Sequence, residues 1–215
     1  MAKVIRIGTR PSPLAKKQAE EIAKRIPQFR VNIAAIETKG DLDKQTPLFS
    51  REDSDLFTRE IEEALLRGDI DAAVHSAKDL ESNIPSGLVI AAMTRSISPS
   101  ECLVSRGNLS LSELPPGARV GTSSLKRKES LLRFRKDLVV EGIRGNIDER
   151  LAQLDKGKYD AIIVAHAALI RLGYEHRIAQ VIPREIIEPH PLQGRLAIQI
   201  RRNRYDLLDI FKKLD

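Results

Sequence analysis

The sequence of 215 residues is poor in several residue types, and each shortage excludes a class of protein. It contains a single cysteine, Cys102, which excludes an intramolecular disulfide and a cysteine-rich metal site. We predict no metal site from the histidines either, because they lack the close spacing of metal ligands: His75, His166, His176 and His190. Tryptophan is absent and aromatic residues make up 4% of the chain, which leaves few side chains for stacking on nucleobases. No nucleic-acid partner is therefore expected.

Long apolar runs are also missing. No window of about 18 apolar residues could span a membrane, so we expect no membrane partner. The first residues, "MAKVIRIGTR", lead directly into a strand pattern and do not resemble a cleavable signal, which predicts a cytoplasmic protein. The formal net charge of +6 favours small anionic partners, and 41% hydrophobic residues suffice for a core.

The chain alternates between strand-like apolar runs and amphipathic helical stretches. This alternation predicts an α/β fold, in which helices cross over the faces of a sheet. The first series contains "VIRIGT" (4–9), "PLAKKQAEEIAKRI" (13–26), "RVNIAAIET" (30–38), "LFTREIEEALLRG" (56–68) and "IDAAVHS" (70–76). The final stretch, 197–215, reads as a strand and an amphipathic helix that rejoin the first series.

The second half of the chain repeats the first. "RIGTRPSPL" (6–14) is echoed by "RVGTSSL" (119–125), and "LLRGDIDAAVHSAKDL" (65–80) by "LDKGKYDAIIVAHAAL" (154–169). The matches are short and gapped, so chance similarity between ordinary α/β units is the alternative. We predict two similar lobes joined by short crossover segments, with a ligand-binding cleft between the lobes. The first lobe comprises 1–95 plus 195–215, and the second comprises 98–190.

The stretch "VGTSSLKRKES" (120–130) combines hydroxyl groups with cations. It follows a predicted strand and opens a predicted helix, whose first backbone N–H groups have no partner within the helix. These N–H groups and the hydroxyls of Thr122, Ser123 and Ser124 would bind an anion, beside the charges of Lys126 and Arg127. The alternative is an ordinary helix cap followed by a solvated basic face.

Three further stretches place polar groups at predicted strand ends. "GTRPSPL" carries Arg10 and Ser12, "HSAKD" carries Ser76, Lys78 and Asp79, and "GIRGNIDERL" (142–151) carries Arg144, Gly145 and Arg150. Glycine at such positions lets the backbone approach a ligand. Because guanidinium groups bind carboxylates and phosphates through two parallel hydrogen bonds, several of them together indicate a ligand with several such groups.

Asp79 is the one acid among the residues named above in these stretches. It should remain ionised, because nearby positive charge favours the carboxylate, and it could then stabilise a developing positive centre. The alternative is an aspartate that caps a turn or pairs with Lys78.

Five stretches resemble, in order and spacing, the hydroxymethylbilane synthase (porphobilinogen deaminase) family: "GTRPSPLA", "HSAKDL", "VGTSSLKR", "RGNIDERL" and "YDAIIVAHAALIRLG". The resemblance covers essentially the whole chain. It implies two lobes of the periplasmic-binding-protein-like type and an enzyme that condenses porphobilinogen units into a linear tetrapyrrole, with release of ammonia, in haem biosynthesis. It also implies a dipyrromethane cofactor to which the growing chain is tethered.

The resemblance implies roles for individual residues. Asp79 would be catalytic, steadying the pyrrole nitrogen and the cationic methylene-pyrrole that forms when ammonia leaves. The side-chain carboxylates of substrate and cofactor would be bound by Arg10, Ser12, Ser76, Lys78, Thr122, Ser123, Ser124, Lys126, Arg127, Arg144, Gly145, Arg150, Arg171 and Gln193.

The sequence shows two serious departures from the family. The family has a third, α+β domain with the cysteine that holds the cofactor; we find no counterpart of this domain, and Cys102 matches no cofactor cysteine. The family's glycine-rich, lysine-bearing lid is here "PLFSREDSDLF" (47–57), with Ser50 and Ser54 where lysines are expected and Glu52 and Asp53 in place of glycines. Lys126 also replaces the usual arginine.

These departures leave three hypotheses open. The first is an enzyme that either receives its third domain from a separate polypeptide or holds the cofactor differently. The second is a non-catalytic two-lobed protein that binds a linear tetrapyrrole or another polycarboxylate. The third is a fragment of a longer gene product, which would expose an apolar patch where the further domain docks.

Overall fold

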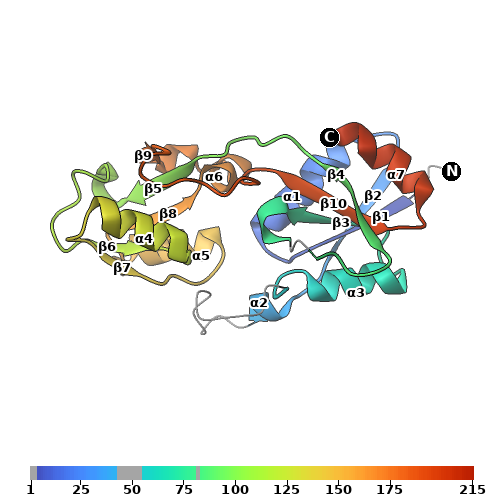
Figure 1. Cartoon of the computed structure of the whole chain (residues 1–215), viewed down its shortest axis with the longest axis horizontal. Helices are drawn as coiled ribbons and strands as arrows, with labels where there is room; N and C mark the ends of the chain where they lie inside the picture. The colour runs from blue at the N-terminus through green and yellow to red at the C-terminus, as the bar shows by residue number, and fades with distance from the viewer. Residues whose placement is uncertain (1–3, 43–54, 81–82) are drawn as a thin grey trace. The chain divides into compact units, whose positions relative to one another are not determined.

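The computed structural model describes residues 4–42, 55–80 and 83–215 (Figure 1). It divides into two compact units, which we call unit 1 and unit 2. Among the described residues, unit 1 runs to Ile97 and includes Gly194–Asp215, and unit 2 comprises Ser98–Gln193. Each unit contains one mixed five-stranded sheet with helices, which confirms the predicted α/β class. The predicted cleft stays a prediction.

The sheet of unit 1 has the order β2-β1-β3-β10-β4. Strand β1 is parallel to β2 and β3, whereas β10 is antiparallel to its neighbours β3 and β4. The strands are β1 (Val4–Thr9), β2 (Arg30–Ala35), β3 (Ala72–Ser76), β4 (Leu88–Met93) and β10 (Leu196–Arg201). The last strand in the sequence thus lies inside the first sheet.

The helices of unit 1 cover both faces of its sheet. They are α1 (Pro13–Lys24), α2 (Lys39–Leu42), α3 (Arg59–Arg67) and α7 (Tyr205–Phe211), and a 3₁₀ turn, η2 (Ala77–Asp79), follows β3. Val74 packs in a cluster with Ile22 of α1 and Phe211 of α7. The preceding residue, Ala73, packs with Leu65 of α3, because successive strand residues face opposite sides.

Unit 2 has the sheet order β7-β6-β8-β5-β9. Its strands are β5 (Glu101–Ser105), β6 (Arg119–Gly121), β7 (Val139–Glu141), β8 (Ala161–Ala165) and β9 (Gln180–Ile182), and its helices are α4 (Leu125–Phe134), α5 (Ile147–Asp155) and α6 (His166–Leu172). Leu131 of α4 packs with Ile163, whereas Leu154 of α5 and Leu169 of α6 pack with Ile162. The helices again cover both faces.

The two units repeat each other in strand order and in detail. Strand β6 is parallel to β7 and β8, and β5 is antiparallel to β8 and β9, as β1 and β10 are to their neighbours. In unit 1 the N–H of Asp71 donates to the carbonyl of Arg6 at 2.8 Å, and the Arg6 N–H donates to the Asp71 carboxylate at 2.9 Å. Asp160 and Arg119 exchange the same two bonds in unit 2, both at 2.8 Å. The repeat in the sequence is therefore a repeat of structure.

Candidate functional site

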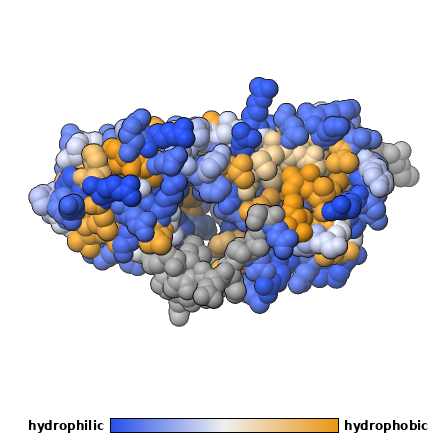
Figure 2. All heavy atoms as spheres, in the orientation of Figure 1, coloured by the Kyte–Doolittle hydropathy of each residue, from blue (hydrophilic) through white to orange (hydrophobic). Residues whose placement is uncertain are grey.

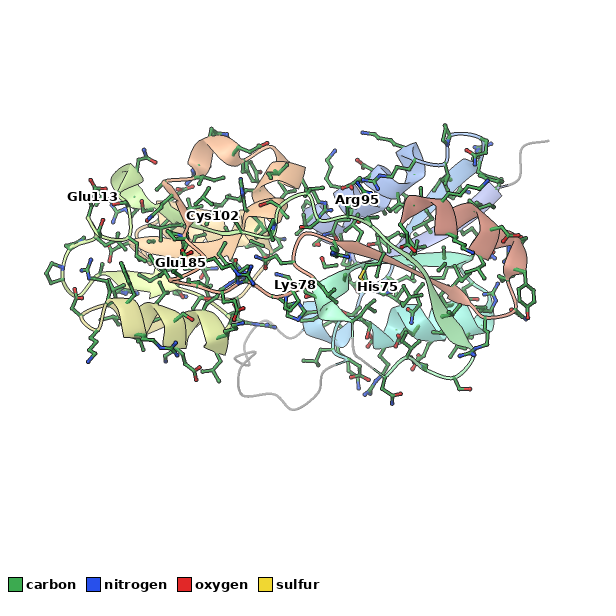
Figure 3. All side chains as sticks on the ribbon, turned by 45° about the horizontal axis from the view of Figure 1, so that its top comes forward. His75, Lys78, Arg95, Cys102, Glu113 and Glu185 are labelled. Carbon is green, nitrogen blue, oxygen red and sulfur yellow. The ribbon has the colours of Figure 1, made fainter. Side chains whose placement is uncertain are left out.

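One edge of the unit 1 sheet gathers the polar residues predicted for that half. Strands β1, β3 and β4 end at this edge, and β10 begins there because it is antiparallel to β3 and β4. The residues that follow or precede these strand ends are Arg10, Ser12, Lys78, Asp79, Arg95 and Arg195. Figure 3 shows Lys78 beyond the end of β3, near His75. We call this region the unit 1 strand-end edge.

In the first turn of this edge, the side chain of Arg10 is held by other residues of unit 1. Ser12 caps α1, because its Oγ accepts a hydrogen bond from the Ala15 N–H at 3.2 Å. The Nε of Arg10 donates to the Asp41 carboxylate at 3.1 Å, its Nη2 donates to the same group, and its guanidinium lies 4.0 Å from the ring centre of Phe57. Among the described residues, the Nη1 group of Arg10 has no hydrogen-bond partner. Arg10 therefore keeps one amino group for a ligand.

The carboxyl group of Asp41 is held ionised by this contact. Burial alone would raise its pKa, but hydrogen bonds from Arg10 and Thr38 outweigh burial and lower the pKa below its usual value. The sequence pattern did not indicate Asp41. It lies 31 residues from Arg10, so no local pattern shows the pairing.

Asp79 stands at the end of η2 and is half-buried. Within the part of the chain that the structure describes, its carboxylate accepts no hydrogen bond and forms no ion pair, and pairing with Lys78 is not seen. Ser76, at the start of the turn, accepts a hydrogen bond from the Gln18 side chain at 2.9 Å. The Asp79 carboxylate, which is predicted to be catalytic, is thus not engaged in a hydrogen bond or ion pair with a described residue.

A buried polar chain lies beneath this turn. Gln199 donates its amide hydrogen to Glu62 at 2.8 Å, and its amide oxygen lies 3.2 Å from the Nε2 of His75. Burial lowers the pKa of His75 to about 4, and the charge of Arg10 adds to this against the hydrogen bond with Gln199. His75 is therefore neutral near pH 7 and carries its proton on Nε2. No role was predicted for it from the sequence.

The corresponding turn of unit 2 forms a helix cap. Ser124 accepts a hydrogen bond from the Arg127 N–H at 3.4 Å, and Thr122 accepts one from the Ser124 N–H at 3.3 Å. Ser123 donates its hydroxyl hydrogen to the carbonyl of Ile143. The capping alternative is therefore realised, with Ser124 as the cap. Thr122 is only 1% exposed, so its side chain supports the turn from inside.

Arg127 and Lys126 differ in how they are held. The guanidinium of Arg127 donates to both carboxylate oxygens of Glu101, at 2.9 and 2.7 Å, and the two side chains are 11% and 4% exposed. Lys126 is exposed and lies 3.5 Å from Glu188. Figure 2 shows mainly hydrophilic atoms over the visible face of α4, with apolar groups between them. Arg127 is therefore part of the structure of unit 2, and Lys126 is a surface charge.

The loop before α5 presents the remaining predicted cations. Gly145 has a φ of 104°, which lies in the left-handed region that favours glycine, and its carbonyl accepts a hydrogen bond from the Nε of Arg150 at 2.8 Å. The Arg144 carbonyl accepts one from Gln153 at 2.9 Å. Arg144 and Arg150 are both half-buried, and Arg171, in the last turn of α6, is half-buried as well.

Gln193 and Cys102 lie inside unit 2. The side-chain amide of Gln193 is buried and donates to the carbonyls of Pro99 and Ser100, at 2.9 and 3.0 Å, so it fastens one crossover segment to the other. Cys102 is fully buried in β5, and its thiol donates to the Val164 carbonyl (Figure 3). Burial, with a smaller effect of Glu101, raises the pKa of Cys102 to about 12.

The described residues offer no cluster of metal ligands. Among them, no group of three or more His, Cys, Asp and Glu side chains could hold a metal ion. In the same part of the chain, no helix has both the length and the apolar character needed to cross a membrane. Most of the predicted lid (47–57), including Ser50, Glu52, Asp53 and Ser54, lies outside the described residues.

Comparison of the structure with solved structures shows the fold. The chain is similar to the periplasmic VFT2 domain of BvgS from Bordetella pertussis, with a TM-score of 0.55 and 15% identity over 98% of this chain and 86% of that domain. It is also similar to the sulfate-bound regulatory domain of an OxyR2 mutant from Vibrio vulnificus, with a TM-score of 0.53 and 13% identity over 100% and 97% of the two chains. These likenesses confirm the predicted periplasmic-binding-protein-like fold.

Comparison of the sequence shows the family. Residues 5–209 match the family model described as "Porphobilinogen deaminase, dipyromethane cofactor binding domain". The chain is 43% identical to porphobilinogen deaminases of Pelotomaculum thermopropionicum and Rubrobacter xylanophilus, over its whole length and 70% and 71% of theirs. It is 40% identical to that of Chlorobium chlorochromatii, over 94% of this chain and 66% of that one. The chain therefore belongs to the porphobilinogen deaminase family.

Proposed function

We propose that the protein is a hydroxymethylbilane synthase, an enzyme of haem biosynthesis that condenses porphobilinogen units into a linear tetrapyrrole and releases ammonia at each step. Its membership of the porphobilinogen deaminase family over residues 5–209 supports the assignment. The observation that carries the mechanism is the Asp79 carboxylate, which has no partner among the described residues and lies at an edge otherwise supplied with cations.

The cations of both units bind the carboxylates of the substrate. Each pyrrole carries an acetate and a propionate, and both are recognised by guanidinium and ammonium groups through charge-assisted hydrogen bonds. In unit 2 these groups are Arg144, Arg150 and Arg171, with Lys126 as an exposed point charge. In unit 1 Arg10 contributes its Nη1 group. Arg127 acts indirectly, since its guanidinium donates to Glu101 and its backbone N–H donates to Ser124, which stabilises the turn of Ser123 and Ser124.

Asp79 supplies the chemistry. When the bond between the methylene carbon and the nitrogen of the protonated aminomethyl group breaks, nitrogen leaves with the electron pair as ammonia and the pyrrole becomes a cation. A fixed carboxylate stabilises this cation and the pyrrole N–H beside it. The carbon of the next pyrrole ring then attacks the methylene carbon and loses its proton, which Asp79 accepts or passes to water.

The residues of this chain fit the carboxylates of a dipyrromethane, but its one cysteine does not fit the covalent attachment. Arg144, Arg150 and the turn of Ser123 and Ser124 would hold the carboxylates of the group, which supplies the pyrrole to which the first unit is joined. Cys102 is fully buried, and its pKa is raised to about 12, so it does not offer a thiolate. In our proposal the anchoring thiol lies outside these 215 residues, and a separate polypeptide is one source of it.

The second candidate is a non-catalytic protein that binds a linear tetrapyrrole or another polycarboxylate. It is favoured by the lid sequence, where Glu52 and Asp53 add acidic groups and Ser50 and Ser54 stand at positions expected to hold lysines. Like charges near a polycarboxylate weaken its binding.

Incubation of the purified chain with porphobilinogen tests the two candidates. The enzyme releases ammonia, measured by a coupled assay, and when an anchoring thiol is supplied, the molecule that carries this thiol gains the mass of two pyrroles. A binding protein shows reversible binding by calorimetry, loses it in Arg144→Ala, and releases no ammonia. A chain that neither binds nor converts porphobilinogen overturns both assignments.

A further inference from the structure

Arg195 occupies the unit 1 strand-end edge and is not among the residues for which the sequence predicts a role. It stands between Gly194, whose φ is 81°, and the start of β10 at Leu196. Its carbonyl accepts a hydrogen bond from the Ala77 N–H at 3.0 Å. Ala77 begins the turn that carries Lys78 and Asp79, so the backbone of Arg195 is fixed directly to that turn.

The side chain of Arg195 lacks acceptors. It is half-buried, its Nε is buried, and neither that atom nor the rest of the guanidinium has a hydrogen bond or ion pair among the described residues. By contrast, Arg127 donates to both oxygens of Glu101 and Arg6 donates to both oxygens of Asp71. A buried donor without an acceptor costs free energy, which a ligand that brings the acceptor recovers.

The surroundings indicate the charge of that ligand. Lys78 lies in η2, which follows β3, one neighbour of β10. Arg95 follows β4, the other neighbour, where the Thr94 N–H donates to the Leu196 carbonyl at 2.8 Å. Arg95 is exposed and has no hydrogen bond or ion pair to a described residue (Figure 3). Cations on three adjacent strand ends favour an anion with carboxylate groups.

We infer that Arg195 binds a carboxylate of the pyrrole substrate and is a specificity-determining residue for the acetate or propionate nearest Asp79. The Nε–H and one Nη2 hydrogen form two parallel bonds to the carboxylate oxygens, a geometry that lysine cannot reproduce. Arg95 adds positive charge without fixing the orientation. The inference rests on the proposed function and adds one residue to its substrate site.

Calorimetric titration with porphobilinogen tests this assignment in the full chain. Arg195→Ala should weaken binding roughly ten- to a hundredfold, the usual effect of losing a hydrogen bond to a charged group, and Arg195→Lys should lie between that variant and the unchanged chain. Arg202→Ala is the matched control, because Arg202 is an exposed arginine just beyond the opposite end of β10. It should change the affinity by less than about twofold.

Two further measurements separate a ligand contact from a structural one. With the dimethyl ester of porphobilinogen, which carries no carboxylates, the difference between Arg195→Ala and the unchanged chain should vanish. Without ligand, Arg195→Met should unfold at the same or a higher temperature, because it removes a buried donor that lacks an acceptor. A lower melting temperature for Arg195→Met, together with unchanged porphobilinogen binding in Arg195→Ala, overturns the inference and leaves the proposed function intact. No binding by the unchanged chain overturns both.

Discussion

Units 1 and 2 have the same strand order and the same strand-turn-helix at the start of the sheet, yet they differ in the residues after the equivalent strands β3 and β8. The second and third residues after β3 are Lys78 and Asp79, whereas the second and third residues after β8 are Ala167 and Ala168 of α6. The acid is therefore present in one copy, although the fold is present in two. A duplicated scaffold can therefore carry an acid in one copy alone, because the acid depends on the residues after one strand and not on the fold.

The largest difference between the units should be in how much the ion pairs of Arg127 and Arg10 contribute to the free energy of unfolding. Glu101→Gln leaves the buried guanidinium of Arg127 without its carboxylate and should lower the free energy of unfolding by about 3–5 kcal/mol. Asp41→Asn, the matched change in unit 1, should cost less than half as much, because Arg10 is more exposed and keeps its contact with Phe57. Urea denaturation of both variants measures the difference. Equal losses would show that the two arginines are equivalent.

The chemical difference is tested at Asp79. Asp79→Asn should reduce ammonia release from porphobilinogen at least about a hundredfold, because the charge that stabilises the cation is lost while the shape of the side chain remains. Porphobilinogen binding should remain roughly as it was. Asp209→Asn, an exposed change on α7 in the same unit, is the control and should leave turnover unaltered. Full turnover in Asp79→Asn would remove Asp79 from the mechanism.

The aspartates that precede the equivalent strands β3 and β8, Asp71 and Asp160, should differ in how much they stabilise the fold. Burial alone would raise the pKa of Asp71, but hydrogen bonds from Arg6 and Arg204 lower it to about 2. Since this folded value lies below the unfolded value of about 4, the stabilisation is present above pH 4 and disappears as pH falls through 2. Asp71→Asn should therefore lower the free energy of unfolding by about 1–2 kcal/mol at pH 7, with allowance for partial solvent screening.

Asp160 provides the comparison for Asp71. Among the described residues, its carboxylate accepts a hydrogen bond from the Arg119 main chain and no arginine side chain donates to it. Asp160→Asn should accordingly lower the free energy of unfolding less at pH 7 than Asp71→Asn. Chemical denaturation of both variants at pH 7 measures the two losses, and equal losses would contradict the expected difference.

The smallest effect is expected at the helix caps, where the units are most alike. Ser12 and Ser124 each accept a hydrogen bond from the backbone N–H three residues later, at 3.2 and 3.4 Å. Ser12→Ala and Ser124→Ala should each destabilise the chain by about 1 kcal/mol. Thermal or urea unfolding measures this, with the corresponding glycine variants as a second comparison expected to lose less. A loss above about 3 kcal/mol at either position would indicate a role beyond capping.

The parts of the fold that depend on local pattern were predictable. Hydrophobic periodicity and the Gly-Thr turns indicated β1, α1, β6 and α4, and they also showed the repeat. The predicted helix at 56–68 begins later, at Arg59, because the residues before it form a turn. Short strands such as β7 and β9 have too few residues to show a period and were not predicted.

The partners of the site residues were not predictable in the same way. Arg10 and Arg127 show in the sequence as cations next to hydroxyl groups, which indicates a ligand. Their internal partners, Asp41 and Glu101, are 31 and 26 residues away, and only the assembled sheets bring them together. The Arg195 guanidinium likewise lacks an acceptor because β3, β4 and β10, once assembled, place none beside it, and no local sequence pattern predicts this.

The position of β10 has a consequence for how unit 1 is made on the ribosome. Because β10 lies between β3 and β4, these strands have no hydrogen-bonded neighbour on that side until residues 196–201 have been synthesised. Unit 2 is complete by Gln193, so the nascent chain can fold its second sheet before its first. During that interval the uncovered edges of β3 and β4 are open to pairing with another chain, which makes unit 1 the place where aggregation during synthesis should begin.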